Sequence, residues 1–177
     1  MQAPAIEGVD EMWSGWCHEG GAADLVRALK YRRITAAVTP IADRMASVAG
    51  AARAADVVAW VPCSPTRRTE RGFDPAELLA RALARRLRLR ARRLLHRLDD
   101  EPQTARSREG RLAGPRLVVR QGRVPGSVLV VDDVCTTGST LRVAAAALRA
   151  AGATEVVAAV ATVAPSSPRQ PVAVPIP

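Results

Sequence analysis

The stretch that decides the fold runs from Ser127 to Leu141 and reads Ser-Val-Leu-Val-Val-Asp-Asp-Val-Cys-Thr-Thr-Gly-Ser-Thr-Leu. Its first five residues, apolar after Ser127, are typical of a buried strand. Two carboxylates follow, Asp132 and Asp133, and then a turn rich in threonine with one glycine. An alanine-rich helix is expected over 140–151, stopped by the glycine at 152. Because ligands of open α/β sheets bind at the carboxyl ends of strands, this unit is expected to form a binding site.

The turn has the chemistry of a phosphate cradle. Gly138 permits a positive φ or a close backbone approach, and the helix that follows directs its positive end at the turn. Backbone N–H groups and hydroxyls are supplied by Cys135, Thr136, Thr137, Ser139 and Thr140.

The adjacent acids need a different partner, and either a ribose diol or Mg²⁺ would suit them. Phosphoribosyl pyrophosphate (PRPP) combines a 5′-phosphate, a 2′,3′-diol and a pyrophosphate that chelates Mg²⁺. The alternative is a buried strand and a capped helix with an incidental acid pair.

Strands and helices are expected to alternate outward from this unit. Apolar runs predict buried strands over 56–61 and 154–163 and a further strand over 92–98. Helices are expected over 22–30, over 39–49 and from 75 to about 87. This order predicts an α/β fold with a central, mostly parallel sheet flanked by helices.

Caps and breakers define the expected boundaries. Thr39 followed by Pro40 is expected to open one helix. Asp74 is expected to cap another, with Pro75 in its first position, Glu77 completing a capping box and Phe73 stapled onto Leu78. Residues 1–20 are expected to be irregular, and 99–114 to form a mobile loop. We expect a single domain over 1–163 and a disordered tail over 164–177, which holds five prolines.

The run from Val128 to Leu141 resembles the PRPP-binding signature of type I phosphoribosyltransferases. The resemblance implies that Asp132 and Asp133 hold the ribose diol at the catalytic centre, with Mg²⁺ bound nearby through the ligand. It also implies that the 5′-phosphate is bound by the loop of Val134, Cys135, Thr136, Thr137, Gly138, Ser139 and Thr140.

A second resemblance is to the ComF family, which consists of phosphoribosyltransferase-like proteins linked to competence and DNA uptake. It is carried by the order of Leu29-Lys30-Tyr31, Val61-Pro62, Arg71-Gly72-Phe73 and Pro102-Gln103, all before the acid pair. Many members have an N-terminal four-cysteine zinc module, whereas this region holds only Cys17-His18, so we expect no zinc. Asp74-Pro75 stands where Asn-Gln is usual, and the arginine/asparagine pattern after the glutamine is blurred.

Two further arginine-containing segments are candidates for ligand contact. In the wider enzyme family the turn equivalent to 61–65 contacts pyrophosphate, and guanidinium groups hold phosphate with two hydrogen bonds. The pyrophosphate candidates are Cys63, Ser64, Arg67 and Arg71, with Arg68 beside them; a solvated basic loop is an equal alternative for Arg67 and Arg68. By resemblance the loop from 102 to 111 is a lid that closes over the ligand, and Arg106 and Arg108 are its candidate contacts. The alternative is a flexible basic loop without such a role.

The net charge of +9 favours anionic partners. Arg81, Arg85 and Arg88 share one helix face, so a solvated face is the simpler interpretation, and weak salt-sensitive DNA contact stays open. Three separated cysteines fit a reducing cytoplasm, and we expect no signal peptide and no membrane contact. Neither histidine has metal-ligand spacing.

Two functions follow as hypotheses. One is transfer of a 5-phosphoribosyl group from PRPP to a nitrogen of an unidentified nucleobase-like acceptor, with release of pyrophosphate. The other is a non-enzymatic role as a competence accessory or a PRPP sensor. The family resemblance leaves a homodimer open, and the sequence identifies neither the acceptor nor a general base.

Overall fold

The computed structural model describes residues 5–32, 34–49, 54–98, 115–119 and 124–165. They form a parallel five-stranded sheet in the order β1-β7-β6-β2-β3, with a separate antiparallel pair, β4 and β5. The sheet strands are β1 (Glu11–Cys17), β2 (Val57–Trp60), β3 (Arg90–Ala91), β6 (Ser127–Cys135) and β7 (Glu155–Val163). The small pair joins β4 (Leu95–Arg97) to β5 (Leu117–Val119). The expected central, mostly parallel sheet is therefore confirmed.

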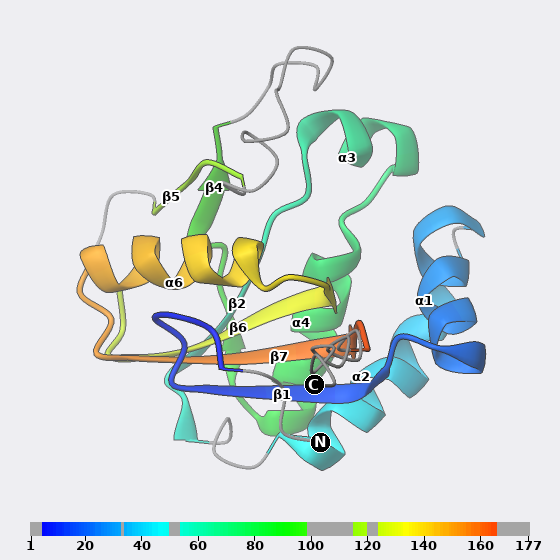
Figure 1. Cartoon of the computed structure of the whole chain (residues 1–177), viewed down its shortest axis with the longest axis horizontal. Coiled ribbons are helices and arrows are strands. Elements are labelled where there is room, and N and C mark those ends of the chain that lie inside the picture. The colour runs from blue at the N-terminus through cyan, green and yellow to red at the C-terminus, as the bar shows by residue number, and fades with distance from the viewer. Residues whose placement is uncertain (1–4, 33, 50–53, 99–114, 120–123, 166–177) are drawn as a thin grey trace, which may run out of the picture.

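Helices cover both faces of the sheet (Figure 1). On one face lie α2 (Val38–Val48) and α4 (Pro75–Leu87), with α1 (Gly20–Arg32) beside them. On the other face lies α6 (Ser139–Ala150). A short helix, α3 (Pro65–Arg71), stands beyond the end of β2. No helix in the described ranges is long and apolar enough to cross a bilayer.

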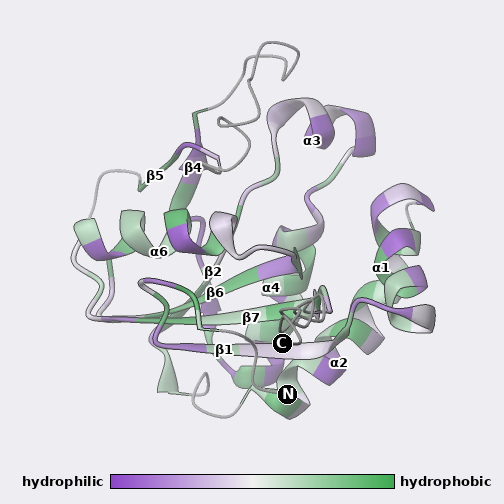
Figure 2. Ribbon diagram, viewed as in Figure 1, coloured by the Kyte–Doolittle hydropathy of each residue, from purple (hydrophilic) through white to green (hydrophobic). Residues whose placement is uncertain are grey.

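The core consists of two apolar layers separated by the sheet. Alternate residues of a strand face opposite sides, so Val128 and Val130 pack toward α6 while Leu129 and Val131 pack toward α2 and α4. All four are at most 1% exposed, which explains why β6 is an unbroken apolar run rather than an alternating one. Figure 2 shows these apolar strands between the helices and hydrophilic residues at the carboxyl end of β6 and on α3.

The expectation that residues 1–20 are irregular is wrong, because β1 pairs in parallel with β7 at the sheet edge. Gly15 is required there: a Cβ at this position would lie 2.8 Å from the carbonyl oxygen of Ala161. The buried Ser14 hydroxyl donates to the carbonyl of Trp16 at 2.7 Å. These two small or polar residues interrupt the apolar pattern and conceal the strand.

Two expected boundaries also change. α2 begins at Val38 with Ala37 at its cap, because the 3-10 turn Thr35–Ala37 leads directly into it; Thr39 is therefore not the cap. β6 does not end before the acids but continues to Cys135, since β7 runs beside it as far as Val163. The segment over 92–98 gives only β4, with β3 just before it. The loop 99–114 and nearly all of the tail lie outside the described residues.

Candidate functional site

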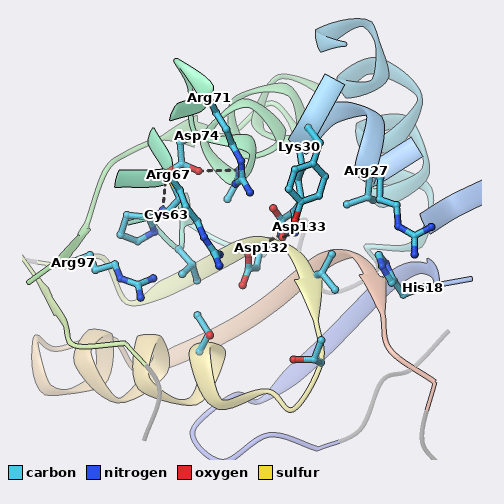
Figure 3. A pocket seen from close by; sticks show the side chains of 18 residues that line it. His18, Arg27, Lys30, Cys63, Arg67, Arg71, Asp74, Arg97, Asp132 and Asp133 are labelled. Atoms are coloured by element: carbon cyan, nitrogen blue, oxygen red, sulfur yellow. Dashed lines mark hydrogen bonds and ion pairs between the residues drawn. The ribbon is translucent and has the colours of Figure 1, made fainter. Parts of the chain in front are cut away.

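The site is a pocket of about 340 Å³ at the carboxyl ends of β6 and β2. Its walls come from segments far apart in the chain: the end of β1, α1, the β2–α3 turn, α3, the start of α4, β4 and the β6–α6 turn (Figure 3). The polar and charged side chains that line it are His18, Arg27, Lys30, Tyr31, Cys63, Arg67, Arg71, Asp74, Arg97, Asp132, Asp133, Thr136 and Thr140.

Both predicted acids line this pocket. Because strand residues alternate in direction, Asp132 lies on the α6 side and Asp133 on the α1 side. The Lys30 ammonium lies 2.7 Å from Asp133 Oδ1, and the two side chains are 18% and 14% exposed. The Asp133 N–H donates to Asp132 Oδ1 at 2.8 Å. Burial, followed by the negative charge of Asp133, raises the pKa of Asp132 well above its ordinary value, so a cation or hydroxyl donors would stabilise its ionised form.

The predicted phosphate turn joins β6 to α6. Gly138 caps the helix with φ +76°, a conformation that glycine adopts without strain. α6 carries no acid in its first turn, so its positive end is uncompensated there. Thr136 and Thr140 face the main pocket. A small cavity of about 20 Å³ is lined by Asp132 and the turn residues Val134, Cys135, Thr136, Thr137, Gly138, Ser139, Thr140 and Leu141.

The predicted basic segment after β2 forms the helix α3, and Arg67 and Arg68 are exposed on it, so their contact with pyrophosphate stays a prediction. Ser64 caps α3 and accepts from the N–H of Arg67 at 3.4 Å. Arg67 and Arg71 are one helical turn apart and both line the pocket. Arg68 instead pairs with Glu77 at 3.3 Å, outside the pocket. Two of the three arginines on this helix therefore face the pocket, and the third forms an ion pair with α4.

Asp74 joins this wall to α4. Its Oδ1 accepts from the N–H groups of Ala76 and Glu77, as predicted for a cap, and its Oδ2 accepts from the N–H of Cys63 at 2.9 Å. The side chain is only 2% exposed, and burial raises its pKa. Burial and the nearby Asp74 charge raise the pKa of Cys63 to about 12, so this thiol is not a nucleophile at neutral pH.

Six polar or charged lining residues were not among the predicted site residues: His18, Arg27, Lys30, Tyr31, Asp74, which was predicted only as a helix cap, and Arg97. Lys30 is the only lysine in the chain, and Lys30-Tyr31 belongs to a segment quoted for the ComF resemblance, which was the available signal. Tyr31 is 71% exposed, and the Arg71 guanidinium lies 5.2 Å from its ring centre. The lid candidates Arg106 and Arg108 lie outside the described residues, so the site is described without them.

Comparison with known proteins agrees with this geometry. A family model for the phosphoribosyl transferase domain matches residues 75–175. The competence protein ComFC of Bacillus subtilis (strain 168) is 34% identical over 94 residues, which confirms the ComF-like relationship. The aligned part covers 52% of this chain and 38% of that relative.

Proposed function

Because the chain belongs to the phosphoribosyl transferase domain family, we propose that it binds PRPP and transfers the 5-phosphoribosyl group to a nitrogen acceptor, releasing pyrophosphate. The observation that carries the proposal is the convergence of three unlike groups on one pocket. These are two carboxylates at the end of β6, an uncompensated helix start beside them, and two arginines on the facing wall.

Each group suits one part of PRPP. The carboxylates Asp132 and Asp133 would accept hydrogen bonds from the 2′- and 3′-hydroxyls. The turn at 136–140 would hold the 5′-phosphate with N–H groups and hydroxyls, aided by the start of α6. Arg67 and Arg71 would pair with the pyrophosphate oxygens. The pocket is thus predicted to orient the sugar with its anomeric carbon between the acids and α3.

Catalysis would consist of supporting charge as the bond to pyrophosphate breaks. Positive charge develops on the ribose ring, beside the carboxylates, and negative charge develops on pyrophosphate, beside the arginines. A hard cation such as Mg²⁺ fits the oxygen donors of Asp132 and Asp133 together with oxygens of the ligand, and when bound it would neutralise the pyrophosphate. The residues would hold these charges in place before reaction, so little reorganisation accompanies the step.

The test of turnover is release of pyrophosphate that depends on an acceptor. Protein, PRPP and Mg²⁺ are incubated with single nucleobases and other nitrogen heterocycles, and pyrophosphate is measured for each. Arg71→Gln should reduce any observed rate by at least about 10²-fold, the size of effect expected when a charge-stabilising donor is lost. Arg85→Gln removes an exposed arginine outside the pocket and is the matched control. Equal rates for the two variants would contradict the assigned role of α3.

A second candidate is a non-enzymatic, competence-type role in handling DNA. Six arginines on and after α4 are exposed: Arg81, Arg85, Arg88, Arg90, Arg92 and Arg93. Such a surface suits a polyanion, whose binding should weaken steeply with salt. This candidate is favoured if fluorescence anisotropy detects salt-dependent binding of single-stranded DNA that Arg85→Gln/Arg88→Gln weakens, while no acceptor yields pyrophosphate. Acceptor-dependent release of pyrophosphate favours the enzyme.

A further inference from the structure

His18 is one of the lining residues that the proposed binding of PRPP does not use, and its position suggests a role. His18 lies on the side of Asp132 and Asp133 that is opposite to Cys63 and Arg67 (Figure 3). A nucleophile that replaces pyrophosphate must approach the anomeric carbon from the face opposite the leaving group. Resting on the proposed function, which puts pyrophosphate at α3, the geometry points to His18 as the base that takes the proton from the incoming nucleophile.

The other titratable groups in the described lining are unsuited to this task. Tyr31 is 71% exposed, and its ring lies against Arg71, on the side assigned to the leaving group. The arginines and Lys30 are proton donors, and Lys30 is held by Asp133. Asp132 and Asp133 are assigned to the diol. Asp74 is engaged as a helix cap and by the N–H of Cys63, and Cys63 remains a thiol at neutral pH. An imidazole is the side chain most often used for proton transfer near neutral pH.

His18 is held in one orientation by two contacts with β7. Its backbone N–H donates to the carbonyl of Val163 at 2.7 Å, and its Nδ1 lies 2.7 Å from Thr162 Oγ1. Thr162 is fully buried and pairs with Val134 of β6, so the anchor is part of the sheet. In the tautomer whose Nδ1–H donates to Thr162, Nε2 carries the lone pair and is the atom available to a ligand.

The step balances without another reactant. The nucleophile's nitrogen forms a bond to the anomeric carbon, and the bond from that carbon to the pyrophosphate oxygen breaks, its electron pair leaving with pyrophosphate. The proton on the nitrogen passes to His18 Nε2 and then to solvent. Water can replace the nitrogen nucleophile, and the products are then ribose 5-phosphate and pyrophosphate. Hydrolysis therefore tests His18 even though the natural acceptor is unidentified.

The experiment compares wild type with His18→Asn and His18→Ala. Stoichiometric protein is incubated with PRPP and Mg²⁺, hydrolysis is followed by phosphorus NMR, and PRPP affinity is measured separately by calorimetry. Both variants should bind PRPP within about threefold of wild type and lose at least about 10²-fold in rate, as expected for general base catalysis. Added imidazole should restore part of the rate in His18→Ala, because the cavity left there opens onto the pocket. His96→Asn changes the only other histidine, which is not in the pocket lining, and should hydrolyse PRPP like wild type.

Three outcomes would overturn the inference: hydrolysis by His18→Asn at the wild-type rate, no response of His18→Ala to imidazole, or wild-type protein that binds PRPP without accelerating its reaction with water or any acceptor. Failure of wild type to bind PRPP is a different result, because it would refute the proposed function itself and remove the premise on which the role of His18 rests.

Discussion

Replacing Asp74 with alanine should destabilise the fold. It should also loosen the part of the pocket formed by the β2–α3 turn and α3, where pyrophosphate is proposed to bind. The carboxylate accepts three backbone hydrogen bonds, two from the first turn of α4 and one from Cys63, and is 2% exposed. Loss of the cap costs about 1 kcal/mol. Leaving the half-buried N–H of Cys63 without its acceptor adds about 1–2 kcal/mol. The expected total is therefore about 2–3 kcal/mol of unfolding free energy.

Asp74→Asn separates the two contributions. One amide oxygen can still cap α4, but the NH₂ group then faces the N–H of Cys63, donor against donor, so a loss of about 1–2 kcal/mol is expected. Urea unfolding measures these differences as shifts in midpoint at constant slope. Asp24→Ala is the control, since this residue is on the surface and 74% exposed and its pair with Arg27 should contribute little. An Asp74→Ala loss no larger than that of Asp24→Ala would refute the role of Asp74 as a bridge between the two segments.

Three further predictions concern the other walls of the site. Gly138→Ala should lower the free energy of unfolding by about 1–2 kcal/mol, measured in urea, because the φ of Gly138 is +76°. Gly21→Ala is the control: this residue lies in open space on α1, so its replacement should be neutral or stabilising. Equal effects of the two variants would contradict the left-handed turn at Gly138. Lys30→Met should lower the free energy of unfolding by about 2 kcal/mol because it leaves Asp133 without its cation. Adding Asp133→Asn should recover part of that loss. Additive losses in the double-mutant cycle would show that the pair is not coupled. Asp132→Asn should gain stability relative to wild type as pH rises above 3.8. The folded-state pKa of Asp132 is raised, so its contribution to stability is present below the ordinary value of 3.8 and is lost as pH rises through the folded pKa. A pH-independent difference in urea midpoint would contradict that shift.

The parts of the fold that the sequence predicts well are those determined by neighbouring residues. The β6–turn–α6 unit carries its strand, breaker and helix signals within one continuous stretch, so the order of its elements and the bounds of α6 follow from the sequence, while the end of β6 lies four residues later than expected. Asp74-Pro75 likewise specified both the start of α4 and its cap, since both depend on the two residues themselves. Ser64-Pro65 carries the same cap signal for α3, a helix that was not among the expected elements.

The parts that were missed depend on contacts between distant residues. β1 is a strand because β7 provides its hydrogen-bonding partner, and the pattern around Ser14 and Gly15 does not reveal that pairing. The Lys30–Asp133 ion pair joins α1 to the end of β6, which requires knowledge of how those elements lie. The same holds for His18, which reaches the pocket only because β1 ends beside Thr162. Residue type alone gives no indication of such placements.

The central claim is tested most directly by titrating the protein with PRPP by calorimetry, with and without Mg²⁺, beside an Asp132→Asn/Asp133→Asn variant whose folding is verified by its urea midpoint. We expect saturable binding that Mg²⁺ strengthens and that the double variant loses, because the carboxylates accept the ribose hydroxyls and support the cation. Equal binding by the folded variant would contradict the assignment of the acids, and the absence of binding by folded wild type would contradict the claim that the pocket is a PRPP site.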